Sequence, residues 1–117
     1  MNDCLQLLQE ACRDRAHIKG FLPAEAVTIQ LETVEGCWLL SISQQGMSCE
    51  ESQSSSPDLR IIGSLETISS WLTGRERLQT HLKLGSLKAV GFYRVQLWFE
   101  SYVWLCRPYE QKHAVNI

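Results

Sequence analysis

The chain has 117 residues, of which 44% are hydrophobic and 21% are charged, and its formal net charge is -2. This length predicts a single domain spanning residues 1–117, with enough buried surface for a true core. The composition is typical of a soluble globular protein and excludes general disorder. The slightly acidic charge supplies no basic field for a phosphate backbone, so we expect no nucleic-acid partner.

The cysteines predict a reducing environment. They are odd in number and contain no Cys-x-x-Cys pair, a pattern that indicates neither a disulfide framework nor a zinc site. Residues 1–15 lack the uninterrupted apolar run of a signal peptide, and no apolar run approaches the roughly 20 residues of a membrane span. We therefore expect a cytoplasmic protein.

The N-terminal half predicts a helix followed by a meander of strands. Apolar residues recur every three or four positions through residues 2–18, which is typical of an amphipathic helix. Apolar and polar residues alternate through 27–33 and again through 37–43, and the turn residues Glu35-Gly36 predict a hairpin between them. Residues 47–50 follow a second turn and have a weak composition for a third strand.

The C-terminal half predicts alternating strands and helices. After a Ser-rich loop at 51–57, residues 58–62 predict a strand, and Ser64 can cap a helix that ends at Gly74. A short helix or helical turn over 75–84 precedes a brief strand at 86–90. Residues 92–105 fit either a strand or a helix by pattern, and their length favours a helix. Residues 109–117 predict a frayed tail. This order predicts an α+β fold, with one sheet covered by helices.

No catalytic or metal-binding set is apparent. The three histidines, His17, His81 and His113, have no recognised spacing, and we expect surface or helix-end positions for them. Glu100 lies within the most apolar segment, where it either faces solvent or anchors an apolar site; the scatter of polar residues around it favours the solvent face. The sequence therefore predicts a protein that is not an enzyme and uses no metal or cofactor.

Aromatic side chains are concentrated between residues 58 and 107, for example at Trp71, Phe99 and Tyr102. An aromatic stripe at helical spacing is most simply part of a core. Their number nevertheless exceeds what one helix-on-sheet contact requires, so the surplus could line a cavity, form a dimer face or bind a partner.

Three short motifs carry a resemblance to a known family: Asp58-Leu59-Arg60-Ile61, Trp71-Leu72-Thr73-Gly74 and Gly85-Ser86-Leu87-Lys88-Ala89-Val90-Gly91. With them, the chain resembles the sterol carrier protein 2 (SCP2-like) family, and in particular its small stand-alone bacterial members. The resemblance implies a mostly antiparallel sheet of about five strands, covered by N-terminal, middle and C-terminal helices. It also implies an apolar tunnel for sterols, fatty acids or acyl-CoA esters, and no catalytic residues.

We therefore expect the chain to bind or carry a lipid or other apolar small molecule between the sheet and the helices of residues 64–84 and 92–105. The candidate lining residues of this apolar pocket are Trp71, Leu72, Leu78, Leu82, Phe92, Val95, Phe99 and Tyr102. The alternative is a structural or interaction module whose apolar face contacts a second copy, as a homodimer, or a partner protein.

Overall fold

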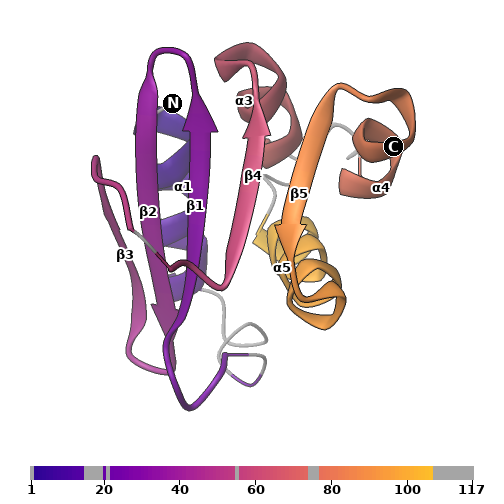
Figure 1. Ribbon diagram of the computed structural model, residues 1–117. Coiled ribbons are helices and arrows are strands. Elements are labelled where there is room, and N and C mark those ends of the chain that lie inside the picture. The colour runs from indigo at the N-terminus through magenta and orange to yellow at the C-terminus, as the bar shows by residue number, and fades with distance from the viewer. Residues whose placement is uncertain (1, 15–19, 21, 55, 74–76, 107–117) are drawn as a thin grey trace, which may run out of the picture.

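The computed structural model describes residues 2–14, 20, 22–54, 56–73 and 77–106. The predicted α+β fold is confirmed (Figure 1). Its elements are α1 (Asn2–Asp14), β1 (Val27–Thr33), β2 (Gly36–Ser43), β3 (Gly46–Glu50), β4 (Leu59–Gly63), α3 (Leu65–Leu72), α4 (Leu78–Leu84), β5 (Leu87–Gly91) and α5 (Tyr93–Cys106).

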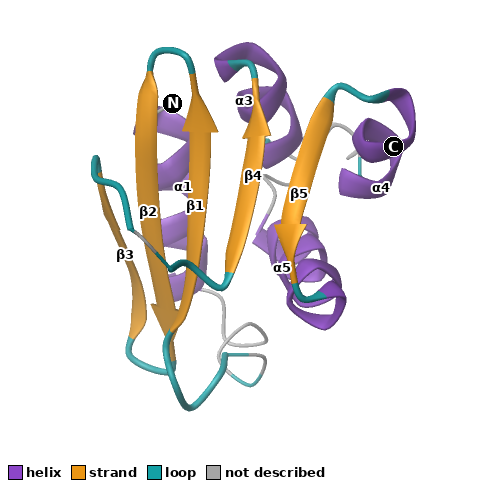
Figure 2. Ribbon diagram, in the orientation of Figure 1, coloured by secondary structure: helices purple, strands orange, loops and turns teal. Residues whose placement is uncertain are grey.

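The strands form a five-stranded sheet in the order β3-β2-β1-β4-β5 (Figure 2). The pairs β1–β2, β2–β3 and β4–β5 are antiparallel, and β1–β4 is parallel, so the predicted mostly antiparallel sheet is confirmed. The weakly predicted third strand is real, because its backbone pairs with β2 from Gly46 to Glu50. Ladder hydrogen bonds here outweigh poor strand propensity.

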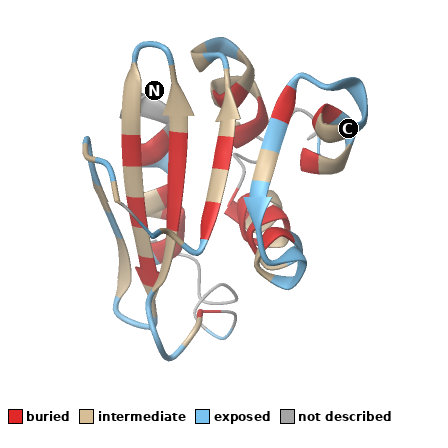
Figure 3. Ribbon diagram, viewed as in Figure 1, coloured by how far each residue is buried: buried red, intermediate tan, exposed pale blue. Residues whose placement is uncertain are grey.

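Alternation along the strands gives the sheet an apolar inner face. Ile29, Leu40 and Leu59 are neighbours across three strands, and all three are fully buried. Helix α1 packs against β3, α3 and α5, so the three helices form one layer on this face. Figure 3 shows that the buried positions concentrate on β1, β2, β4 and α5, whereas β3 is intermediate or exposed.

The outer face carries a hydrogen-bonded network that fixes the parallel pair. Gln30 accepts from the backbone N–H of Ser54 at 2.8 Å, so the segment between β3 and β4 covers this face over β1. Arg60 of β4 donates to both carboxylate oxygens of Glu32 on β1, at 2.5 and 2.9 Å. These hydrogen bonds lower the pKa of Glu32, which stays ionised.

Asp58, the first residue of the family-like motifs, has a structural role. Its carboxylate accepts from the backbone N–H of Thr28 at 2.9 Å, and its own N–H donates to the carbonyl of Thr28 at 3.0 Å. This exchange lies just before the first β1–β4 pair, Ile29 with Leu59. It therefore sets the register of the parallel strands.

The helix boundaries follow local chemistry. Ser64 caps α3, because its side chain accepts from the N–H of Thr67 at 3.0 Å, as predicted. Gly85 ends α4 in the left-handed region, with φ of 78°. Residues 92–105, whose pattern fits either a strand or a helix, belong mostly to the helix α5, as their length predicted. The predicted helix ends at residues 18 and 74, along with the tail at 109–117, lie outside the described residues.

Two polar residues lie in surroundings that differ from those predicted for them. Glu100 is buried, so its predicted solvent-facing position is wrong: its carboxylate accepts from the backbone N–H of Gln79 at 3.0 Å. A carboxylate here satisfies one of the donors left unpaired at the start of α4, whose N-cap residue Arg77 makes no side-chain cap. His81 lies in the last turn of α4, as expected, but is buried.

Candidate functional site

The structure separates the eight predicted lining residues into three environments. Five are fully buried: Trp71, Leu72, Leu78, Phe99 and Tyr102. Two are partly buried against the same core: Leu82 and Val95. Phe92 is 70% exposed, because it follows Gly91 at the corner where β5 ends and α5 begins.

The buried Trp71, Phe99 and Tyr102 pack with the partly buried Trp98 as an aromatic cluster of Trp71, Trp98, Phe99 and Tyr102. The ring of Phe99 meets that of Trp71 edge to face, with 5.6 Å between centroids, and Trp98 stacks on Tyr102 at 5.4 Å. Both arrangements are favourable geometries for aromatic pairs. The cluster joins α3 to α5 within the hydrophobic core.

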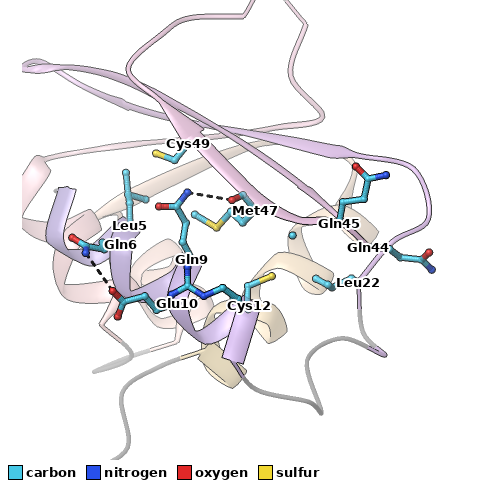
Figure 4. A pocket seen from close by; sticks show the side chains of 12 residues that line it. Leu5, Gln6, Gln9, Glu10, Cys12, Leu22, Gln44, Gln45, Met47 and Cys49 are labelled. Carbon is cyan, nitrogen blue, oxygen red and sulfur yellow. Dashed lines mark hydrogen bonds between the residues drawn. The ribbon is translucent and has the colours of Figure 1, made fainter.

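A groove of about 840 Å³ lies elsewhere, between α1 and the β2–β3 hairpin (Figure 4). None of the eight predicted residues lines it. The groove is lined by Leu5, Gln6, Gln9, Glu10, Cys12, Arg13, Leu22, Gln44, Gln45, Gly46, Met47 and Cys49.

The groove has an apolar floor and a polar rim. Leu5, Cys12 and Leu22 are buried, and Met47 and Cys49 are partly buried on the inner face of β3. The rim carries the amides of α1 and of the β2–β3 turn, together with one acidic and one basic side chain. More polar than apolar surface is exposed in the groove, so this arrangement suits a ligand whose polar end contacts the rim and whose apolar part contacts the floor.

Side-chain to backbone contact holds the two walls together. Gln9 on α1 donates through Nε2 to the carbonyl oxygen of Met47 at 3.2 Å, which satisfies an acceptor on the outer edge of β3 (Figure 4). Gln6 donates to Glu10 at 3.2 Å along the same helix. The helix therefore satisfies one backbone acceptor of the edge strand β3 and leaves the groove open beside it.

The Cys49 thiol at the floor is uncharged. Burial raises the pKa of the Cys49 thiol, and the adjacent charge of Glu50 raises it further. A protonated thiol behaves as a small apolar group and a poor nucleophile. The floor therefore favours apolar contact over covalent chemistry.

Tyr102 connects the aromatic cluster to the groove. Its hydroxyl donates to Sδ of Met47, with 3.6 Å between oxygen and sulfur. Burial raises the pKa of this hydroxyl well above its usual value, and the nearby thiols of Cys106 and Cys12 act in the same direction. Because Met47 and Cys12 both line the groove, the tyrosine lies directly behind its floor.

Sequence reasoning missed the groove because its walls have no distinctive local pattern. Leu5 and Cys12 belong to an ordinary amphipathic stripe, and Met47 lies in the strand with the weakest composition. Gln9 and Met47 are 38 positions apart. The alternation that puts Met47 and Cys49 on one face was the available indication, but it does not show that α1 leaves space above them.

The described residues show neither a metal set nor a membrane-crossing helix. Among them, no three His, Cys, Asp or Glu side chains gather closely enough to hold a metal ion. Likewise, none of the described helices has the length and apolar character to cross a bilayer.

Solved structures with the same fold include sterol carrier proteins. A ubiquinone synthesis protein, UbiJ-SCP2, matches with a TM-score of 0.67 at 16% identity, covering 86% of this chain and 85% of that chain. The sterol carrier protein domain 2 of Helicoverpa armigera gives 0.66 at 13%, covering 86% and 83%. Sterol carrier protein 2 from Yarrowia lipolytica, in its apo form, gives 0.57 at 13%, covering 89% of both chains. These likenesses show the fold.

Sequence comparison leads to the same group. No curated protein sequence matches this chain. The family model described as the SCP-2 sterol transfer family matches residues 2–94, which include α1, the whole sheet and the beginning of α5. The chain therefore belongs to the SCP-2 sterol transfer family.

Proposed function

We propose that the protein binds and carries a lipid, such as a sterol, a fatty acid or an acyl-CoA ester, without catalysing a reaction on it. The observation that carries this proposal is the groove between α1 and β3, with its apolar floor and polar rim. Membership of a sterol transfer family supports lipid as the ligand class.

Burial of the apolar chain supplies the affinity. Each methylene group removed from water contributes about 0.8 kcal/mol, so a long acyl chain or a sterol ring system needs few polar contacts. The amides of Gln9, Gln44 and Gln45 at the rim can bind the polar end of the lipid. The aromatic cluster, which includes three of the eight predicted residues, lies behind Met47 and supports the floor without lining the groove.

The binding position of the lipid can be tested by measuring which thiols it protects from alkylation. Cys49 lines the groove, whereas Cys37 is a free thiol on the opposite face of the sheet and serves as the internal control. At a free lipid concentration about ten times Kd, we expect alkylation of Cys49 to slow roughly tenfold. Alkylation of Cys37 should not change. Mass spectrometry of peptides after timed alkylation measures both rates.

The lipids to be tested are oleate, oleoyl-CoA and cholesterol, and each is added to delipidated protein. Thermal stabilisation without protection of Cys49 would place the lipid outside the groove, for example among the predicted residues of α3 and α5. If no lipid raises Tm and none co-purifies with the protein in native mass spectrometry, lipid carriage is wrong.

The cysteines support a cytoplasmic location. Within the part of the chain that the structure describes, Cys12, Cys37, Cys49 and Cys106 form no disulfide. Protein thiols persist in this form where glutathione and thioredoxin keep them reduced. We propose that the protein works in this compartment.

A second candidate function, contact with a second copy of the chain, is favoured by an exposed apolar corner. Val90, Phe92, Tyr93 and Leu97 are exposed where β5 meets α5. Within the described residues, β5 pairs with β4 alone, so its outer edge is free to pair. Antiparallel pairing of two β5 strands about a two-fold axis would continue the sheet and cover both corners.

The dimer is tested by light scattering across a range of protein concentrations. We expect a monomer–dimer equilibrium that Val90→Lys shifts towards monomer, since a charge on a strand that pairs edge to edge opposes association. Val34→Lys is the matched control, because Val34 is 98% exposed in the β1–β2 turn, far from β5. A wild-type protein that stays monomeric at millimolar concentration would exclude this interface.

A further inference from the structure

The hydroxyl of Tyr102 is a strong donor, and the acceptors that the described residues offer it are weak. The side chain is fully buried, and its hydrogen-bond acceptor is the thioether sulfur of Met47 at 3.6 Å. The other groups that act on the hydroxyl are the thiols of Cys106 and Cys12. Thioether and thiol sulfur accept hydrogen bonds weakly, whereas a phenol hydroxyl donates well. The buried Tyr102 hydroxyl therefore makes weaker hydrogen bonds to these sulfur atoms than it would make to an oxygen acceptor.

Met47 separates this donor from the groove. Its backbone is fixed, because its carbonyl accepts from Gln9 and its strand pairs with β2. Its side chain is unbranched, has three rotatable bonds and is only partly buried. Rotation of this side chain away from Tyr102 would remove the sulfur between the hydroxyl and the groove without moving the backbone.

The surroundings select the type of oxygen that can replace the sulfur. The raised pKa of Tyr102 keeps its hydroxyl protonated, so it acts as a donor. The walls beside it are sulfur and aromatic carbon, from Met47, Cys12 and the ring of Trp98. An ionised carboxylate would lose its hydration here, whereas a neutral carbonyl oxygen loses less and accepts one hydrogen bond.

We propose that the groove takes lipids carrying a neutral carbonyl oxygen, such as a ketone or an ester, and that the Tyr102 hydroxyl donates to this oxygen in place of Met47 Sδ. This inference rests on the proposed lipid carriage and adds the chemical class of the ligand. Tyr102 is then the residue that orients the lipid along the groove.

The test uses two probes that differ at one position, 2-tetradecanone and tetradecane, each competing with a fluorescent fatty acid for the delipidated protein. We expect wild type to bind the ketone about fivefold more tightly than the alkane, the size of one net hydrogen bond. In Tyr102→Phe the preference should disappear while the affinity for tetradecane is unchanged. Met47→Leu is the control, because it removes the sulfur acceptor and should retain the preference.

A second readout does not depend on the folding of a variant. The carbonyl stretching frequency of carbon-13-labelled ketone bound to wild type should lie below its value in alkane solvent, because a hydrogen bond weakens the double bond. An unshifted frequency, equal binding of both probes, or a preference that survives in Tyr102→Phe would overturn the proposal. Failure of both probes and of the fatty acid to bind would instead contradict lipid carriage itself.

Discussion

Replacing Phe99 with alanine is expected to lower the free energy of unfolding by about 4 kcal/mol, the typical cost of truncating a buried phenylalanine. The side chain is fully buried and lies between Trp71 on α3 and Tyr102 on α5. Its removal leaves a cavity and takes away edge-to-face and stacked contacts. Urea unfolding followed by tryptophan fluorescence measures the change.

The matched control is Phe92→Ala, the same substitution at a position that is 70% exposed. Here the free energy of unfolding should change by no more than about 0.5 kcal/mol, as for other surface positions. The comparison should be made at low protein concentration, so that self-association does not contribute. Similar losses for the two variants would contradict the burial difference at these positions.

The stability of Phe99→Ala also shows whether Phe99 is a core residue or lines a tunnel. A phenylalanine that lines an empty tunnel loses few packing contacts on truncation, so its variant would keep most of its stability and lose lipid affinity. Because about 4 kcal/mol is a large part of the 5 to 15 kcal/mol that holds a typical domain, Phe99→Leu is the milder second variant. We expect it to cost about 1 to 2 kcal/mol.

Gly91→Ala is expected to destabilise the protein by about 3 kcal/mol or more. Gly91 has a φ of 150°, and a Cβ atom there would lie 2.5 Å from the carbonyl oxygen of Asp58 and 3.1 Å from Cα of Leu59. Both neighbours belong to backbone that is held in place, since Asp58 exchanges hydrogen bonds with Thr28. The added methyl group must therefore separate β5 from β4.

Gly20→Ala is the control for this substitution. A Cβ atom at Gly20 would meet no atom within 4 Å, so the variant should match wild type or gain slightly from a less flexible unfolded chain. Thermal unfolding of the two variants, with circular dichroism as a check on the sheet, measures the difference. Equal Tm values would show that β4 and β5 can separate at little cost.

Local patterns were sufficient for most of the elements. Alternation of apolar and polar residues predicted β1 and β2, and the Ser64 cap predicted the start of α3. The length of the last apolar segment predicted the helix α5. The parallel pairing of β1 with β4 has no such pattern, because it depends on the carboxylate of Asp58 and on the ion pair between Arg60 and Glu32. These contacts join residues about 30 positions apart.

The candidate site was harder to predict, because residue type alone does not determine the environment. Phe92 and Phe99 belong to the same aromatic segment, yet one is exposed and the other buried. The difference arises at Gly91, where the chain turns from strand to helix, so that Phe92 lies at the corner and Phe99 two helical turns further inside. Glu100 was misplaced for a similar reason, since its partner is the start of a different helix.

The groove and the aromatic cluster come from different parts of the chain. Every lining residue of the groove lies within the first 49 positions, and every ring of the cluster lies after position 70, with Tyr102 and Met47 at the boundary. Substitutions at the polar rim of the groove can therefore change ligand preference without altering the aromatic cluster, whereas the floor residues Leu5, Cys12 and Leu22 belong to the same core as the cluster. For protein engineering, a new α1 and β2–β3 hairpin could be grafted onto the same aromatic half to redirect the groove towards a different lipid.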